Sequence, residues 1–135
     1  MDRIDLEPVT LERLLALTRR GAAAGRLLGR IGPAGLTVVQ LGILADLDRA
    51  GALHLRALAR RQSCRRPSVD EAVRSLAAAG WIRRIATTDR RLSRWALEPE
   101  GAAQLGRVRD RVGGFPPAAL ARILTIDGRE LCWEW

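Results

Sequence analysis

Apolar residues recur at helical spacing in the first quarter of the chain. Between about Val9 and Arg30 the apolar positions are Leu11, Leu14, Leu15, Leu27 and Leu28. This spacing predicts a helix that starts after Pro8 and stops at Gly32 and Pro33. Three glycines spaced by four share one face of it: Gly21, Gly25 and Gly29. They either let another helix approach closely or weaken this helix, and both interpretations stay open.

Two further helices are predicted before the middle of the chain. Thr37 is followed three residues later by Gln40, a capping-box pattern, and an apolar face then continues until Gly51. A shorter helix is expected from about Leu55 to Arg61. His54 lies at its start; it is the only histidine and has no partner motif, so we expect it to be a residue of the helix entry or of the surface rather than a ligand.

A fourth helix and a hairpin follow. The helix is predicted over residues 66–79, with Gly80 as its terminator and a buried face formed by Val69, Val73 and Leu76. Two strand-like runs, 81–86 and 92–97, flank the charged turn 87–91 and predict a β-hairpin. Each arm carries one tryptophan, Trp81 and Trp95, which we expect to pack beneath the hairpin rather than to stack on bases.

The last third of the chain begins with another helix signal. Glu98, Pro99 and Glu100 open a helix that runs to about Val112, because proline suits a first turn and acids suit the positive helix end. Residues 113 and 114 are glycines, and a further helix is predicted over 115–124. The tail 125–135 alternates around an Asp-Gly pair and predicts a hairpin instead. Its tryptophans, Trp133 and Trp135, would share one face of a strand and need a cover.

Positive charge is concentrated in one stretch of the sequence. Residues 54–94 hold eleven arginines against three acids, which gives 11 − 3 = +8, the net charge of the whole chain. The rest of the chain carries twelve arginines and twelve acids, and there is no lysine. Biased arginine usage would spread such an excess evenly, whereas a local block is typical of a surface that binds a polyanion such as nucleic acid.

Composition excludes several other classes. A length of 135 residues with 47% apolar and 28% charged residues suits a single globular domain. There is no apolar run long enough for a membrane span and no secretory signal, so we expect a cytoplasmic protein without membrane contact. The two cysteines, Cys64 and Cys132, form neither a disulfide framework nor a zinc site. Without a nucleophile motif or a phosphate loop we expect no enzyme, no cofactor and no metal; an enzyme with an arginine-lined anion site is the weakest hypothesis.

A helix, a tight turn, a second helix and a basic hairpin together form the winged helix-turn-helix arrangement. At this point the chain resembles the MarR family of transcriptional regulators over about residues 36–106. The resemblance rests on the order and spacing of LTVVQLGILADL, LRALARRQSCRRPSVDEAVRSLAAAGWIRR and TTDRRLSRWALEPEGAAQL. The basic block coincides with this motif.

The resemblance implies a fold class, mainly α with a small β-hairpin wing. It assigns a winged helix-turn-helix to about 36–98, dimerisation helices to about 8–32 and 99–124, and an atypical tail to 125–135. It further implies a homodimer that binds double-stranded DNA, most often as a repressor. A small-molecule effector would release this dimer from the DNA. The candidate DNA-binding residues lie on the second helix and the wing: Arg65, Arg66, Ser68, Glu71, Arg74, Arg90 and Arg91. Asp89 would brace a wing arginine.

The chain also departs from the family pattern. A step of 100° per residue from Val69 places Glu71 on the outward face, beside Arg74. Glu71 either accepts from a cytosine amino group or pairs with Arg74, and we favour the pairing. The threonine usual before the family's fifth helix is Glu98 here. Cys64 is expected to be a buried thiol, with a redox switch as the alternative because neighbouring arginines favour a thiolate.

Two functions from different classes follow. The first is a DNA-binding transcriptional regulator. The alternative is a MarR-like dimeric module whose DNA binding is weakened by Glu71 and whose tryptophan-rich tail meets another protein.

Overall fold

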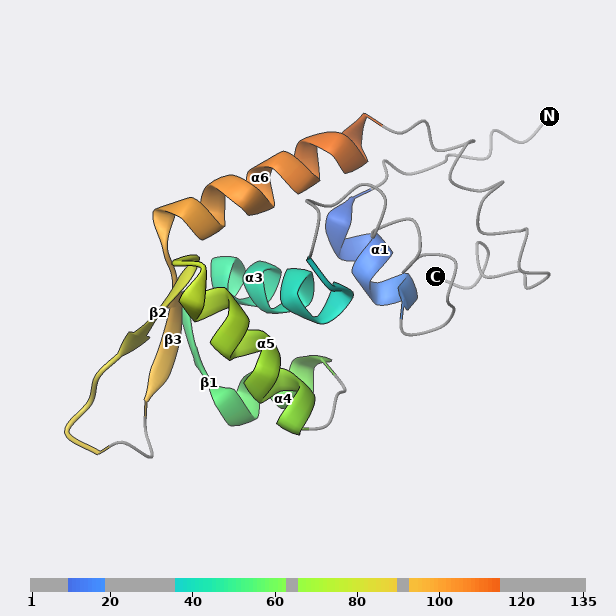
Figure 1. Cartoon of the computed structure of the whole chain (residues 1–135). Coiled ribbons are helices and arrows are strands. Elements are labelled where there is room, and N and C mark those ends of the chain that lie inside the picture. The colour runs from blue at the N-terminus through green and yellow to red at the C-terminus, as the bar shows by residue number, and fades with distance from the viewer. Residues whose placement is uncertain (1–9, 19–35, 63–65, 90–92, 115–135) are drawn as a thin grey trace, which may run out of the picture. The chain divides into compact units, whose positions relative to one another are not determined.

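The computed structural model describes residues 10–18, 36–62, 66–89 and 93–114 (Figure 1). In chain order the elements are α1 (Leu11–Thr18), α3 (Val38–Ala50), β1 (Ala52–His54), α4 (Leu55–Gln62), α5 (Arg66–Ala78), β2 (Ile82–Ile85), β3 (Arg94–Leu97) and α6 (Pro99–Gly113). The predicted fold class, mainly α with a small β-wing, is confirmed. The chain divides into two units, residues 39–106 and a second unit that combines the two ends of the chain.

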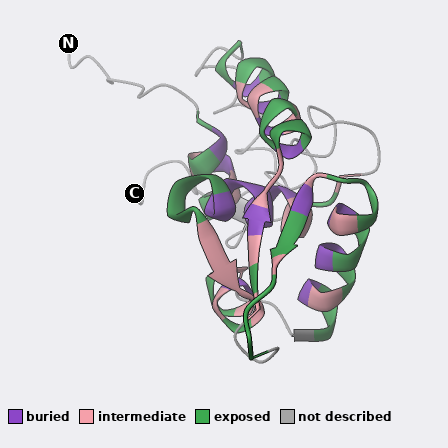
Figure 2. Ribbon diagram, turned by 90° about the vertical axis from the view of Figure 1, so that its left-hand side faces the viewer, coloured by how far each residue is buried: buried purple, intermediate pink, exposed green. Residues whose placement is uncertain are grey.

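Helix α3 lies at the centre of the unit 39–106. All seven residues from Leu41 to Leu47 are buried, including the carboxylate residue Asp46. The sequence predicted one buried face, whereas the middle of this helix is buried all round. Figure 2 shows the buried positions on the inner sides of the ribbons and the exposed positions outside. The other elements of the unit contribute Leu58, Val69, Ala72, Val73, Leu76, Ile82, Ala96 and Leu105 to the core.

Glycines end α3 and α5, as the sequence predicts. Gly51 and Gly80 have φ angles of 87° and 79°, a left-handed conformation that is costly for residues with a Cβ. The Gly51 N–H donates to the Leu47 carbonyl at 2.9 Å. After Gly80, the Trp81 N–H donates to the Leu76 carbonyl at 3.0 Å, and the chain turns directly into β2.

The sheet has three antiparallel strands in the order β1-β3-β2. The predicted hairpin is confirmed as β2 and β3, with Arg84 opposite Trp95. Strand β1 was not predicted: it pairs with β3 through Leu53 opposite Trp95 and His54 opposite Arg94. Three residues are too short to show a strand period, and their partner lies about forty positions further along the chain. His54 is thus the last residue of a strand and is half-buried rather than simply a surface residue.

Helix α6 begins where the sequence predicts. Pro99 is its first residue, and the Glu98 carbonyl accepts from the Ala102 N–H at 2.9 Å. Proline is favoured at this position because the first N–H groups of a helix have no partner within it.

The second unit contains α1 and the C-terminal part of α6. The Thr10 hydroxyl accepts from the Arg13 N–H at 3.2 Å and caps α1. The apolar side chains of both helices are buried at Leu11, Leu14, Val108 and Val112. The Arg109 guanidinium donates to the Glu12 carboxylate at 2.7 Å, so an ion pair joins the two helices.

Several predictions fall outside the described residues. They are the continuation of the first helix to Arg30 with its glycines, the helix 115–124 and the tail 125–135. Cys64 and the wing tip 90–92 are also outside the described part of the chain.

Candidate nucleic-acid interface

Helices α4 and α5 pack against each other, and each also contacts a strand of the sheet. Val69, Val73 and Leu76 hold α5 to the core and are at most 2% exposed. The opposite face is exposed along the helix, at Pro67, Glu71, Arg74 and Ala78. This confirms the predicted helical register. An exposed second helix beside a basic hairpin is the geometry that lets a protein enter a DNA groove.

Three predicted DNA-binding residues are described on this helix, and all are exposed: Ser68, Glu71 and Arg74. The favoured ion pair between Glu71 and Arg74 is wrong, since the structure shows no such pair among the described side chains. Arg74 Nε instead donates to the Asp70 carbonyl at 3.4 Å. The Glu71 charge therefore remains on the outward face. Arg66 is the first residue of α5, but its side chain and Arg65 lie outside the described part of the chain.

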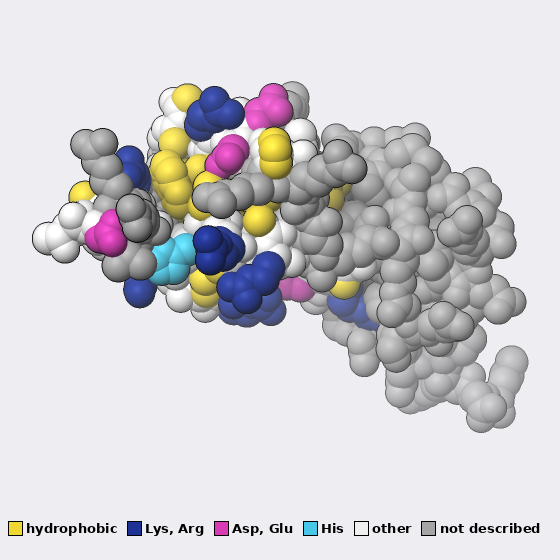
Figure 3. Space-filling model, turned by 90° about the horizontal axis from the view of Figure 1, so that it is seen from below, with side chains coloured by type: hydrophobic (Ala, Val, Ile, Leu, Met, Phe, Trp, Pro, Cys, Tyr) yellow, Lys and Arg dark blue, Asp and Glu magenta, His cyan; other side chains and the backbone are white. Residues whose placement is uncertain are grey.

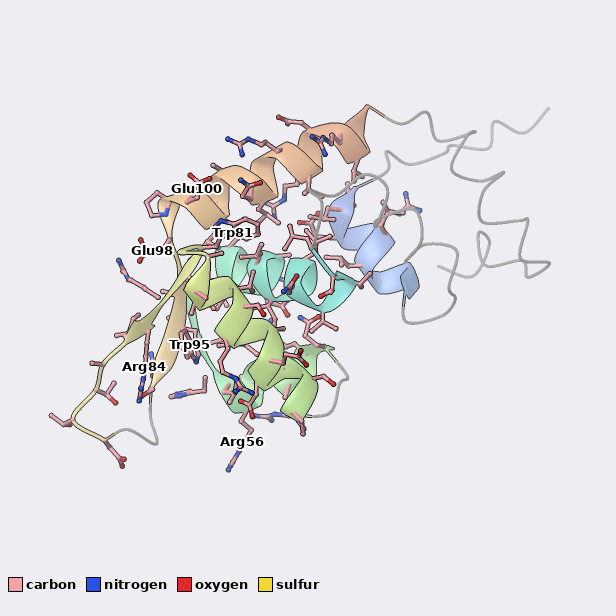
Figure 4. The ribbon with its side chains drawn as sticks, viewed as in Figure 1. Arg56, Trp81, Arg84, Trp95, Glu98 and Glu100 are labelled. Atoms are coloured by element: carbon pink, nitrogen blue, oxygen red, sulfur yellow. The ribbon has the colours of Figure 1, made fainter. Side chains whose placement is uncertain are left out.

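Helix α4 adds arginines that were not among the predicted site residues. Arg56 and Arg60 are exposed and four residues apart, so they share a face of α4. Figure 3 shows dark-blue arginine side chains gathered beside the histidine on the underside of the molecule, and Figure 4 shows Arg56 pointing away from the body. Their spacing within the basic block is the signal from which they could have been predicted.

The last turn of α4 is anchored to the central helix by a buried carboxylate. Asp46 accepts from the Gln62 side-chain amide at 2.6 Å and lies 3.9 Å from Arg61. Gly42 makes room for this contact, because a Cβ there would overlap the Gln62 side chain. The end of α4, from which the chain continues toward α5, is thereby fixed to α3.

The two neighbouring arginines of β2 have different partners. Successive strand residues point to opposite faces, so Arg83 and Arg84 diverge. Arg83 Nε lies 3.6 Å from the Glu98 carboxylate, which compensates the charge of Arg83. Arg84 instead donates to the Ser93 hydroxyl through Nε at 3.0 Å and Nη2 at 2.8 Å. Its positive charge is not compensated by that contact.

Ser93 is also held from the other side of β3. His54 Nδ1 lies 3.2 Å from the Ser93 carbonyl oxygen. Because a carbonyl oxygen only accepts, Nδ1 carries the hydrogen. Ser93, which immediately precedes β3, is therefore bonded to Arg84 of β2 and to His54 of β1.

Of the charged turn 87–91, the structure describes residues 87–89. Asp89 is exposed, and its carbonyl accepts from the Thr87 hydroxyl. Arg90 and Arg91 lie outside the described residues, so the bracing role of Asp89 stays a prediction. The tryptophans below the tip, Trp81 and Trp95, are half-buried, in agreement with packing beneath the hairpin.

Most of the described arginines in the basic block, residues 54–94, have no carboxylate close enough to compensate their charge. All of them are exposed: Arg56, Arg60, Arg61, Arg74, Arg83, Arg84 and Arg94. Within the described ranges, only Arg61 and Arg83 of this set lie within 4 Å of a carboxylate. The positive surface that sequence segregation predicts is thus retained over α4, α5 and the sheet.

Other kinds of site have less support in the described part of the chain. It contains no group of three or more His, Cys, Asp or Glu side chains that could hold a metal ion. None of its helices is long and apolar enough to cross a membrane.

A helix pair followed by a β-hairpin, with a third strand completing the sheet, defines a winged helix-turn-helix protein. The family model that matches this chain is the MarR family, over residues 36–92. The matched segment begins just before α3 and ends at the wing tip. Residues 36–92 are thus similar to the MarR family, in agreement with the resemblance found in the sequence.

Solved structures support the same fold. A MarR mutant from E. coli complexed with operator DNA is 21% identical, covers 86% of this chain and 78% of its own, and has a TM-score of 0.62. The transcriptional regulator BldR from Sulfolobus solfataricus is 24% identical over 94% of this chain and 87% of its own, with a TM-score of 0.61. The YusO protein from Bacillus subtilis is 25% identical over 87% and 85%, with a TM-score of 0.56. No curated protein matches the sequence.

Proposed function

We propose that this protein is a DNA-binding transcriptional regulator that binds double-stranded DNA as a homodimer and represses transcription. The observation that carries the proposal is the exposed, mostly uncompensated arginine set on α4, α5 and the sheet of a MarR-family domain. Arginines on such a surface bind phosphates and release counterions. A similar structure described as a complex with operator DNA supports the same partner.

In this proposal α5 lies in the major groove and the wing follows the backbone toward the minor groove. The DNA-binding residues are those named from the sequence: Arg65, Arg66, Ser68, Glu71, Arg74, Arg90 and Arg91. Two subunits would place two such helices in successive major grooves of a pseudo-palindromic site. Dimerisation through the ends of the chain is what the resemblance to the family implies. A small-molecule effector would release the DNA.

Binding to random-sequence DNA and to upstream genomic DNA, each measured over a range of salt concentrations, tests the proposal. A regulator should bind both with a steep salt dependence and prefer upstream fragments. Absence of any salt-dependent binding would overturn it.

A protein-interaction module remains the second candidate because Glu71 stays exposed on α5 without pairing to Arg74. A carboxylate in this place repels phosphate unless it contacts a cytosine. Binding without preference for any sequence, together with capture of a defined protein by the tail, would favour this candidate.

A further inference from the structure

The sheet holds one arginine side chain in a fixed orientation with its charge uncompensated. Arg84 donates to a single oxygen, Ser93 Oγ, through both Nε and Nη2. A guanidinium has five N–H donors in a rigid plane, so two bonds to one oxygen fix the plane and leave the Nη1 edge to another acceptor. The described residues place no carboxylate within 4 Å of Arg84.

Ser93 is suited to hold that orientation. It stands immediately before β3, and the hydrogen bond from His54 fixes its carbonyl to β1. Arg84 stands opposite Trp95, so Ser93 is its diagonal neighbour on the same face of the sheet. Figure 4 shows Arg84 and Trp95 next to each other on the two adjoining strands. The serine thus links all three strands at the base of the wing.

The neighbouring arginine provides an internal comparison. Arg83 lies in the same strand, and its side chain is on the opposite face of the sheet. The Glu98 carboxylate lies 3.6 Å from Arg83 Nε. Arg83 carries an ion pair, whereas Arg84 carries a net positive charge held by a neutral hydroxyl. The second arrangement attracts a phosphate more strongly, because no carboxylate offsets its charge.

We propose that Arg84 binds a DNA backbone phosphate at the base of the wing and that Ser93 is the positioning residue that orients its guanidinium. The inference rests on the proposed function and adds two residues to the DNA-binding surface. It assigns to the base of the wing a phosphate contact separate from the arginines of the wing tip.

The test measures the affinity of the full chain for a labelled random-sequence DNA duplex between about 50 and about 200 mM salt. Arg84→Ala should lower affinity about tenfold, the equivalent of one charge-assisted hydrogen bond. It should also flatten the slope of log K against log salt by about one. Arg84→Lys should keep the slope near wild type because it keeps the charge. It should bind more weakly, because an ammonium group cannot donate the two hydrogen bonds by which the guanidinium is fixed to Ser93 Oγ. Arg83→Ala, the matched control, should leave the slope unchanged.

Ser93 is tested by a double-mutant cycle. Ser93→Ala should weaken DNA binding roughly threefold without changing the salt slope. Ser93→Thr keeps the hydroxyl and should bind DNA with wild-type affinity. In the Arg84→Ala background, Ser93→Ala should cause no further loss of affinity. Thermal unfolding of each variant checks that it is folded. A wild-type slope in Arg84→Ala, or an equal loss from Ser93→Ala in both backgrounds, would overturn this inference while leaving DNA binding intact. If the wild-type protein does not bind the duplex, the proposed function and this inference both fail.

Discussion

The backbone of α6 at Gly101 packs directly against the backbone of Trp81. The approach is so close that a Cβ on Gly101 would overlap the Trp81 carbonyl oxygen. The same Cβ would stand 2.9 Å from Cδ1 of Leu97. The Trp81 carbonyl also accepts from the Glu98 N–H at 2.9 Å. The start of α6 is therefore set by a backbone contact with the residue that leads into the wing.

Replacing Gly101 by alanine should destabilise the fold. The obstacle is a backbone oxygen rather than a flexible side chain, so we expect a loss of roughly 1 to 3 kcal/mol in the free energy of unfolding, measured in denaturant. Gly106 is the matched control: it lies in the same helix, and a Cβ added there would have no atom within 4 Å. Gly106→Ala should stabilise by up to about 1 kcal/mol. Equal effects at both positions would contradict the close approach.

Removing the Asp46 carboxylate should loosen the end of α4. Asp46→Ala leaves the amide of Gln62 without its acceptor, and we expect a loss of about 1 to 3 kcal/mol in unfolding free energy. Asp46→Asn keeps an acceptor for Gln62 and should lose less. Asp110→Ala, at an exposed site on α6, serves as the control. If Asp46→Ala unfolds like the wild type, the contact does not stabilise the helix pair.

The wing tip should contribute electrostatic affinity that does not depend on sequence. Replacing Arg90 and Arg91 together by alanine should weaken binding to every duplex. The slope of log K against log salt should flatten by up to about two if both side chains touch phosphates. An unchanged slope in a salt titration would mean that Arg90 and Arg91 do not contact DNA phosphates.

Glu71→Gln separates the two candidate functions, because it keeps the shape of the side chain and removes its charge. If Glu71 contacts a cytosine, the variant should lose roughly 1 to 3 kcal/mol of discrimination at one base pair and bind random DNA slightly better. Selection from a random library measures both effects. A uniform gain with no preferred site would favour the interaction module, and no change at all would place Glu71 away from the DNA.

Deleting residues 1–32 should disrupt the dimer that we propose. The deletion removes the buried Leu11 and Leu14 and the Glu12 partner of Arg109, and so exposes apolar surface of α6. We expect a monomer or an aggregate by size-exclusion chromatography with light scattering. A well-behaved dimer after this truncation would locate the interface elsewhere.

The local elements of the DNA-binding unit could be predicted because their signals are local. Gly51 and Gly80 mark helix ends through their backbone freedom, and Pro99 marks a first turn. The apolar period of α5 also determined its outward face, so Glu71 and Arg74 could be placed there from the sequence alone. Charge segregation identified the basic surface for the same reason: it is a property of neighbouring positions in the chain.

Pairing between distant residues was decided only by the tertiary structure. Strand β1 is too short to show a period and exists through its ladder with β3, about forty residues away. The partners of Arg83 and Arg84 depend on which face of the sheet each one occupies and on what stands opposite, so the sequence did not distinguish the neutralised arginine from the charged one. Glu71 and Arg74 have the spacing of an ion pair, yet Arg74 bonds to a backbone carbonyl. Spacing permits such a contact, but side-chain packing and competing acceptors determine whether it forms.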